Sequence, residues 1–291
     1  MAMEEHPQAP SSQADIDDNR ANWDDRAQVH AQGGYGDVQA LARNHSYVSG
    51  VVRRDFEVLK PHLDEHGVEG KSLLHLQCHI GLDTLSWYHL GARNVCGLDF
   101  SPKSLEYARA LAQEAQAPIK FVEADARFAD QALPGEHFDL VVTSVGTITW
   151  LPSLDEWAHS IAHLLEPGGL FMIRDSHPLL FAVDPDSFAL TGDYFSGAED
   201  TYESDQSYTP GSAGKVKHTT NHNWSHDFAE ITRVLIGAGL TLEALGEYEV
   251  NDWQPFPQMV YDTKDEGWRM PAGAPQIPQT FSIVARKPVQ A

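Results

Sequence analysis

Hydrophobic and polar positions form alternating blocks between residues 71 and 175. Short, continuously apolar runs are typical of buried strands, and the segments between them carry apolar residues at helical spacing. The expected strands are 73–76, 94–98, 119–123, 138–144 and 170–174, and the expected helices are 83–90, 101–115 and 154–165. Strands that alternate with helices indicate a parallel sheet covered on both faces. We therefore predict a doubly wound α/β fold.

The pattern changes on either side of this core. Residues 1–18 are polar and lack apolar periodicity, which predicts a disordered tail. Residues 19–60 predict two helices separated at Gly33-Gly34, which we interpret as an amino-terminal helical lid. The main domain is expected over 61–291, with an insertion at about 176–223 that is rich in acids and tyrosines. An amphipathic helix capped by Ser225 and strands at 240–248 and 280–286 are expected to complete the sheet.

Candidate chemistry first occurs in the stretch SLLHLQCHIGLDTLSWYHLGARNVCGLDFS, residues 72–101. An apolar strand is followed by Gly81, a helix and a second strand that ends in Asp99. In such a unit the glycine lets the backbone approach a ligand, and the acid accepts ribose hydroxyls. The stretch predicts a site for a nucleotide-type cofactor. Asp99 could alternatively serve only to cap the helix entered at Ser101.

Composition excludes several partners. The formal net charge of −22 and the pI near 4.9 argue against nucleic acids and anionic membranes, since binding polyanions requires clustered Lys and Arg. Cys78 and Cys96 lie in apolar contexts and are expected to be buried thiols of a reducing compartment. No stretch approaches 18 apolar residues, so the sequence predicts a cytoplasmic protein without a membrane span.

The order of elements over about 71–287, with FDLVVTS at 138–144 and LLEPGGLFMI at 164–173, resembles the class I S-adenosylmethionine-dependent methyltransferases. The resemblance implies a Rossmann-like, seven-stranded, mostly parallel sheet with an antiparallel last strand, and S-adenosylmethionine as cofactor. The first loop reads LHLQC-x-x-G, which is similar to an uncharacterised bacterial subgroup, where most of the family has LDLGCGTG. That subgroup suggests a cofactor but no substrate.

The resemblance implies a cofactor role for several residues. The first loop would wrap the methionine part, with Gln77 and His79 at glycine positions and His75 at the position of a family acid. The side chains of Gln77 and His79 could also hold the loop through hydrogen bonds. Asp99 would accept the ribose hydroxyls, and Asp125 could alternatively be an ordinary loop acid. The cofactor residues implied for the core are Gln77, Cys78, Gly81, Asp99, Phe100, Asp125, Ala126 and Ser144, with Val145 beside them.

The lead-in NWDDRAQVH at 22–30, with Tyr35, also resembles the subgroup and in related folds closes over the methionine part. Trp23 and Arg26 are therefore further candidates for cofactor binding. The Arg26 guanidinium could meet the cofactor carboxylate as a fork of donors. A solvated arginine on a surface helix is the open alternative.

Methyl transfer from a sulfonium mainly requires alignment of the nucleophile and exclusion of water. If a base assists, His177 is the first candidate because it follows the fifth strand, and His226 is the second. Both could instead be structural histidines. His218, His222 and His226 recur every four residues, but the residues between them favour strand over helix, so we expect no metal site.

Three functions compete on these observations. We favour a small-molecule methyltransferase that acts alone or as a homodimer. A non-catalytic module that binds S-adenosylmethionine or a nucleoside is the alternative, motivated by the altered glycine loop. A dinucleotide oxidoreductase is excluded because Gln77 and His79 stand where a pyrophosphate requires glycines.

Overall fold

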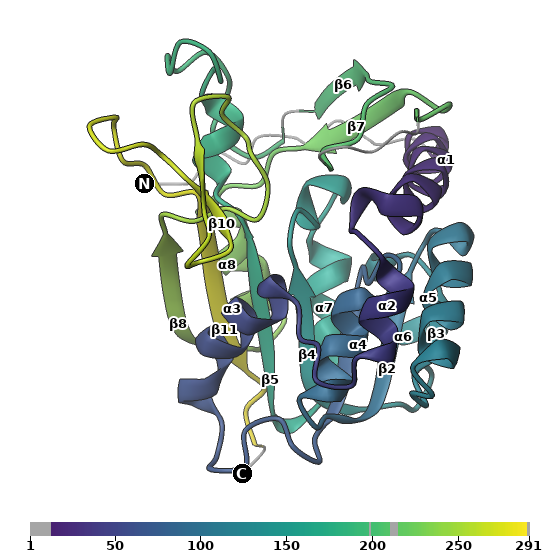
Figure 1. Ribbon diagram of the computed structural model, residues 1–291. Helices are drawn as coiled ribbons and strands as arrows, with labels where there is room; N and C mark the ends of the chain where they lie inside the picture. Colours follow the sequence, from purple (N-terminus) through teal and green to yellow (C-terminus); the bar gives the residue numbers. More distant parts are fainter. Residues whose placement is uncertain (1–12, 198, 210–214, 290–291) are drawn as a thin grey trace.

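The computed structural model describes residues 13–197, 199–209 and 215–289. Its centre is one seven-stranded sheet in the order β3-β2-β1-β4-β5-β11-β8 (Figure 1). The first five strands in this order are parallel, and β11 is antiparallel to both of its neighbours. This confirms the predicted fold class. The strands are β1 (Ser72–Leu76), β2 (Arg93–Asp99), β3 (Lys120–Glu123), β4 (Phe138–Ser144), β5 (Leu165–Ser176), β8 (Thr241–Tyr248) and β11 (Thr280–Arg286).

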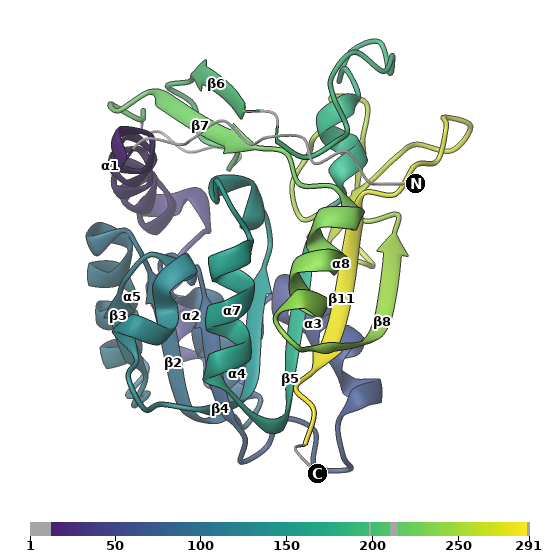
Figure 2. The same cartoon turned by 180° about the vertical axis from the view of Figure 1, so that it is seen from behind.

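Helices cover both faces of the sheet because alternate strand residues point to opposite sides. Leu73 of β1 packs with Val52 and Trp87 on one face, whereas Leu74 packs with Trp157 on the other. The first face carries α3 (Gly50–Leu59), α4 (Leu82–His89) and α5 (Pro102–Glu114). The second carries α6 (Ala129–Ala132), α7 (Asp155–Leu164) and α8 (Phe228–Gly237), which Figure 2 shows from behind.

Two smaller parts lie beyond the carboxyl edge of the sheet (Figure 1). The insertion forms a short helix, η5 (Pro178–Ala182), and the antiparallel pair β6 (Glu199–Glu203) and β7 (Thr220–Trp224). The amino-terminal segment forms α1 (Gln13–Val29), a turn of π-helix η1 (His30–Gly34) and α2 (Val38–Arg43). A second hairpin, β9 (Val260–Asp262) and β10 (Gly267–Arg269), follows β8.

The amino-terminal boundary differs from the prediction. Residues 1–12 of the predicted tail lie outside the described residues, but residues 13–18 are helical and belong to α1. Tertiary contacts explain the difference. The Asn19 side chain donates to the His222 carbonyl at 2.8 Å and accepts from the His222 amide at 2.9 Å, and Ile16 is buried. These contacts fix α1 against β7.

The predicted cap of α8 was also wrong by two residues. Asp227, not Ser225, is the N-cap, and its carboxylate accepts the Glu230 amide hydrogen at 2.9 Å. Gly239 follows the helix in the left-handed conformation, at a φ of 90°. No helix of the described residues is both long enough and apolar enough to span a membrane.

Candidate cofactor and acceptor site

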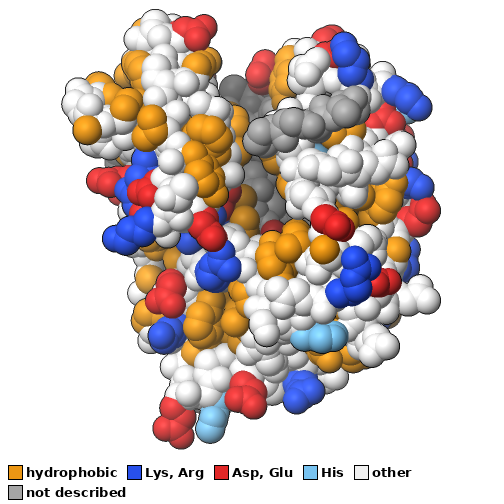
Figure 3. Space-filling model, in the orientation of Figure 1, with side chains coloured by type: hydrophobic (Ala, Val, Ile, Leu, Met, Phe, Trp, Pro, Cys, Tyr) orange, Lys and Arg blue, Asp and Glu red, His pale blue; other side chains and the backbone are white. Residues whose placement is uncertain are grey.

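A cavity of about 790 Å³ lies at the carboxyl edge of the parallel strands. Its size falls in the range of small-molecule and cofactor sites. Figure 3 shows a hollow between the part that carries β9 and β10 and the part that carries α1, β6 and β7. The residues that the sequence assigned to the cofactor all line this one cavity: Trp23, Arg26, Gln77, Cys78, Gly81, Asp99, Phe100, Asp125, Ala126 and Ser144.

The loop after β1 keeps the backbone conformation of a glycine loop although two glycines are replaced. Gln77 and His79 adopt positive φ values of 54° and 49°, a region that side chains rarely enter. Gly81 has a φ of 78°, and a Cβ added there would lie 2.8 Å from the Cβ of Ala108. Only the third position therefore requires glycine for space as well as for conformation.

Side-chain hydrogen bonds hold this unusual loop. Gln77 donates from Nε2 to the Thr147 carbonyl at 2.8 Å, and its Oε1 is buried without a partner among the described residues. The His79 amide donates to Asp99 at 2.8 Å, and its Nδ1 lies 2.9 Å from the Ser104 hydroxyl. The side chains of Gln77 and His79 thus hold the loop through hydrogen bonds, as the sequence analysis gave as an alternative.

The amino-terminal segment contacts the same loop through a second histidine, His30. Nδ1 of His30 lies 2.7 Å from Nε2 of His79, and Nε2 of His30 lies 2.6 Å from the Ser207 hydroxyl. Burial lowers the pKa of His30 to about 2 and that of His79 to about 3, so both rings are neutral. Neutral rings can act as donor at one nitrogen and acceptor at the other. The chain of hydrogen bonds joins the loop, the amino-terminal segment and the insertion.

Asp99 ends β2 inside the cavity and is 6% exposed. One oxygen accepts the His79 amide hydrogen and the other accepts the Ser101 amide hydrogen at 2.9 Å. A carboxylate retains further acceptor positions, as ribose recognition requires. Burial raises its pKa to about 6 against the lowering effect of these two bonds. Asp99 therefore holds the helix entry as well as facing the cavity.

Asp125 follows β3 and lines the cavity, but its carboxylate is also paired. It accepts the Arg127 amide hydrogen at 2.9 Å and forms an ion pair with the Arg127 guanidinium at 2.6 Å. Asp125 thus orders its own turn and keeps a fixed position beside Ala126. Phe100, from the end of β2, lines the same part of the cavity.

Besides Asp99, two charged residues of the cavity have no ion pair among the described residues. Arg26 is 5% exposed and donates from Nε to the Asn22 side chain at 2.6 Å and from Nη2 to the Asn221 side chain at 3.3 Å. Asp83, in the first turn of α4, accepts a hydrogen bond from the Ser49 hydroxyl. Burial raises the pKa of Asp83 to about 6. These are a cation and an anion whose counter-charges the protein itself does not supply.

Sequence reasoning assigned no role to Asp83. An acid in the first turn of a helix is also what the helix dipole favours, so the pattern carried no signal for a ligand site. Asp175 was missed as well. At the end of β5 it accepts hydrogen bonds from the amides of Gly146, Thr147 and Ile148, and thereby orders the loop after β4.

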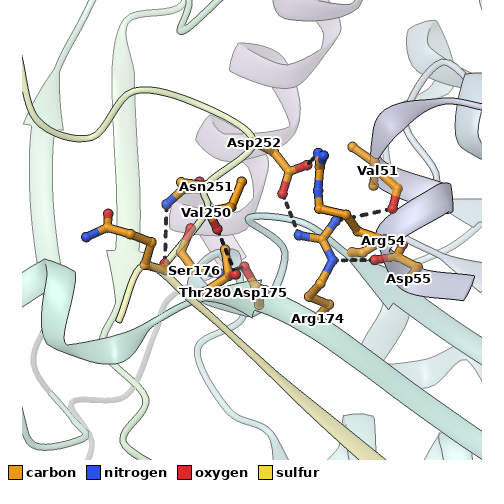
Figure 4. Close-up of polar contacts among 12 residues, drawn as sticks. Val51, Arg54, Asp55, Arg174, Asp175, Ser176, Val250, Asn251, Asp252 and Thr280 are labelled. Carbon is orange, nitrogen blue, oxygen red and sulfur yellow. Dashed lines mark hydrogen bonds and ion pairs between the residues drawn. The ribbon is translucent and has the colours of Figure 1, made fainter. Parts of the chain in front are cut away.

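Arg174 of β5 centres a buried network at the other end of the cavity (Figure 4). Its Nε donates to Asp55 of α3 at 2.5 Å, and its Nη1 donates to Asp252 in the loop after β8. Asp252 also accepts from Arg54, and Asp55 accepts the Ser144 hydroxyl hydrogen at 2.6 Å. The network ties α3, β5 and the carboxy-terminal loop together.

The two candidate bases are not among the residues that line this cavity. His177 accepts the Leu179 amide hydrogen at Nδ1, 3.1 Å away, and its Nε2 lies 2.9 Å from Glu247. His226 contacts Glu230 at 2.8 Å through Nδ1 and the Leu151 carbonyl at 2.8 Å through Nε2. Each ring has both nitrogens in hydrogen bonds. The structure does not bring His177 and His226 to the other candidate residues.

The remaining two histidines of the regularly spaced series also lie away from the cavity. His222 is on β7 and contacts Thr201 at 3.0 Å and Glu199 at 3.1 Å. His218 precedes this strand and contacts Asp25. The expectation of strand rather than helix for this segment is confirmed for residues 220–224.

Comparison with known proteins agrees with this geometry. Residues 73–169, which include the loop after β1, Asp99 and Asp125, match the family model of a methyltransferase domain. This segment of the chain is thus similar to a methyltransferase domain. The cavity beside this segment presents Asp99 together with Arg26 and Asp83, which carry charges of opposite sign.

Solved structures resemble the chain over most of its length. An S-adenosylmethionine-dependent methyltransferase from Mesorhizobium loti has 23% identity, a TM-score of 0.56, and coverage of 80% of this chain and 97% of its own. A protein of Listeria monocytogenes assigned to the same class has 18% identity, a TM-score of 0.57, and coverage of 82% and 99%.

A glycopeptide N-methyltransferase, MtfA, solved with S-adenosylmethionine, has 19% identity, a TM-score of 0.52, and coverage of 83% of this chain and 96% of its own. At such identities the likeness shows the fold alone. No curated protein sequence matches the chain.

Proposed function

We propose that the chain transfers a methyl group from S-adenosylmethionine to a small-molecule acceptor. The observation that carries the proposal is a single cavity that extends from Asp99 on β2 to Ser176 at the end of β5. In open α/β sheets, ligands bind at the carboxyl ends of the strands where the strand order reverses, which here is between β1 and β4. The cavity is large enough to hold a cofactor and part of an acceptor together.

The lining residues match the parts of the cofactor. Asp99 would accept the ribose hydroxyls, and Phe100, Asp125 and Ala126 would surround the adenine. Arg26 would receive the methionine carboxylate. We assign Asp83 to the methionine ammonium, because it is an unpaired carboxylate and His75 leaves the usual position of the family acid uncharged.

The methionine part would lie along the loop from Gln77 to Gly81, with Trp23 above it and Ser144 at its side. S-adenosylmethionine, when bound, supplies an electrophilic methyl group on a sulfonium. The protein orients the two reactants and excludes water, which by itself accelerates a bimolecular step strongly. Trp23, His79 and Trp150 would form an aromatic cover that excludes water. The ring centroid of Trp23 lies 5.0 Å from that of His79 and 5.2 Å from that of Trp150.

We also propose that the chain belongs to the bacterial subgroup with the LHLQC-x-x-G loop. It would be located in the cytoplasm and act alone or as a homodimer. MtfA, a glycopeptide N-methyltransferase, has the same fold, and this supports an acceptor below the size of a protein. The altered glycine loop no longer favours a non-catalytic module, because Gln77 and His79 retain the backbone conformation of glycine.

Calorimetry with S-adenosylmethionine and S-adenosylhomocysteine tests the proposal. Both are expected to bind, and Asp99→Asn is expected to weaken binding about 10-fold to 100-fold, because a hydrogen bond to a charged group contributes about 1.5–3 kcal/mol. Glu106→Gln, on the exposed side of α5, is the matched control. If neither compound bound, the cavity would not be a site for this cofactor. Binding without turnover of labelled methyl groups across a metabolite pool would favour the non-catalytic module.

A further inference from the structure

The cavity has a second part that the proposed cofactor contacts leave free. We call it the acceptor chamber, and it is lined by Val51, Arg54, Phe181, Asp252, Trp253 and Tyr261. These residues come from α3, the insertion and the carboxy-terminal loop. The sheet order places β5 beside β4 and separates it from β2 and β3, which carry Asp99 and Asp125. The chamber therefore lies on the far side of Ser144 from the ribose position.

The charges around the chamber are paired within the protein. Arg54 and Arg174 share Asp252, and Arg174 also binds Asp55, so two cations and two anions form one closed network (Figure 4). Arg174 and Asp55 are 2% and 0% exposed, which leaves Asp252 and Arg54 as the members that line the chamber.

The remaining acid near the chamber is paired as well. Glu266 lines the cavity and forms an ion pair with Arg53 of α3. Arg54 additionally donates from Nη1 to the Asp265 carbonyl at 2.7 Å, so this arginine is held by the same loop. One donor is left in the network: Nε of Arg54 is buried and has no hydrogen-bond partner among the described residues.

Aromatic surface fills the space between these pairs. Phe181 is 45% exposed and Tyr261 is 52% exposed, although the burial of large apolar side chains stabilises a fold. Trp253 is held in place by a 3.3 Å bond from its Nε1 to the Ser176 hydroxyl. Figure 3 shows hydrophobic side chains gathered on the wall of the hollow formed by this part of the molecule. Exposed aromatic side chains that converge in a cavity mark a ligand surface.

We propose that the methyl acceptor is an uncharged aromatic molecule, held in the acceptor chamber by Phe181, Trp253 and Tyr261. A charged acceptor would lose water and meet no free counter-charge among the described residues that line the chamber, since Arg54, Asp252 and Glu266 are already paired and Asp83 is assigned to the cofactor ammonium. The inference rests on the proposed function, because the cofactor must use the unpaired Arg26, Asp83 and Asp99.

Matched ligands test the inference without knowledge of the natural acceptor. We would measure binding of phenylmethanol, benzoate and benzylammonium, and of the three naphthalene analogues, to the full chain saturated with S-adenosylhomocysteine, by ligand-observed NMR titration. The neutral member of each set is expected to bind at least about fivefold more tightly than both charged members. This preference is expected to disappear in Trp253→Ala, which identifies the chamber as the site.

A variant with a released charge provides the converse test. Glu266→Gln leaves Arg53 unpaired beside the chamber at a half-exposed position and should preserve the fold. It is expected to improve benzoate binding by about threefold to tenfold and to leave phenylmethanol unchanged. Asp252→Asn should act in the same direction more strongly, because it removes a carboxylate shared by two arginines.

The outcomes separate the two proposals. Loss of S-adenosylhomocysteine binding in the unmodified chain would contradict the proposed function itself. Retained cofactor binding with equal or tighter binding of benzoate or benzylammonium would overturn the inference of an uncharged acceptor. The same conclusion would follow if no ligand of either set bound in a Trp253-dependent manner.

Discussion

Gln77 and His79 occupy left-handed backbone positions in the cofactor loop, at a conformational cost of about 1 kcal/mol or more each. Their side chains offset part of this cost by hydrogen bonds to Thr147, Ser104 and His30. The loop thus shows that the fold requires a backbone conformation and not glycine as such, except at Gly81.

Replacement of Gln77 by Gly and by Ala separates strain from hydrogen bonding. Both variants lose the bond to Thr147, but only alanine keeps the strained φ. We expect Gln77→Gly to be more stable than Gln77→Ala by about 1 kcal/mol in urea unfolding. Equal stabilities would show that the left-handed conformation costs nothing here.

Asp99 and Asp83 predict opposite effects of pH on stability and on binding. Burial raises both pKa values from 3.8 to about 6. The stability contributed by each group is therefore fully present below pH 3.8 and is lost as the pH rises through about 6. Cofactor binding uses the ionised forms, so affinity for S-adenosylhomocysteine should fall as the pH drops below about 6.

Urea unfolding of the free chain and calorimetry, both between pH 7.5 and pH 5, check this prediction. The double variant Asp83→Asn with Asp99→Asn serves as the reference that removes both titrations. A pH dependence of binding that is identical in the double variant would assign the effect to other groups.

For single residues, the sequence predicted a role only where the place of the residue relative to a strand implies its chemistry. Asp99 and Asp125 could be predicted because they follow strands whose carboxyl ends meet at one edge. Arg174 could not, because an arginine in an apolar strand becomes interpretable only with Asp55 and Asp252, which are remote in the chain.

The Arg174 network is a buried polar contact that joins α3, β5 and the loop after β8. Removal of the arginine leaves Asp55 as a buried carboxylate without an ion pair, while Asp252 keeps Arg54, and an uncompensated buried charge typically costs about 3–5 kcal/mol. We expect Arg174→Gln to lower the free energy of unfolding by about this amount. Arg233→Gln, whose arginine is exposed and lies 3.4 Å from Asp155, should change it by less than about 0.5 kcal/mol.

A second substitution distinguishes charge from packing. Asp55→Asn added to Arg174→Gln removes the carboxylate that the single variant leaves without an ion pair and should recover part of the loss. Strict additivity of the two changes in urea unfolding would show that Asp55 and Arg174 are not coupled through their charges.

Element boundaries could be predicted where local and tertiary preferences agree. The strands β4 and β11 have the predicted bounds, and Ser101 caps α5 through the Ser104 amide as expected. The start of α1 could not be predicted. Its first turns are polar, and they are ordered by contacts to β7, whose pairing with the amino terminus no local pattern encodes.

For the whole molecule, α1 and β7 are predicted to respond to the cofactor as one unit. Asn19 and Asn22 donate to carbonyls of His222 and His218, and α1 also contacts α5 through Asp24 and Ser101. S-adenosylhomocysteine should slow amide exchange in α1 and β7 together, because opening of either would expose the bound ligand.

Hydrogen exchange measured by mass spectrometry checks this, with β8 as an internal control that should not change. Asn19→Ala is expected to speed exchange in both segments of the free chain. Protection confined to the loop after β1 would show that α1 and β7 are no lid.

The doubly wound architecture was predictable because hydrophobic periodicity records it along the chain. The shape of the acceptor chamber was not, since it depends on how the insertion and the loop after β8 fold over the edge. Those segments have little periodicity, and their placement follows from scattered ionic and aromatic contacts.

The hydrogen bonds from Ser104 through His79 and His30 to Ser207 have a thermodynamic consequence. A loop of glycines has no side chains through which distant residues could influence it, whereas this loop does. Substitutions at His30 and His79 should therefore be non-additive in their effect on cofactor affinity. Linkage then makes the reverse hold: occupancy of the loop changes the free energy with which the amino-terminal helix is docked.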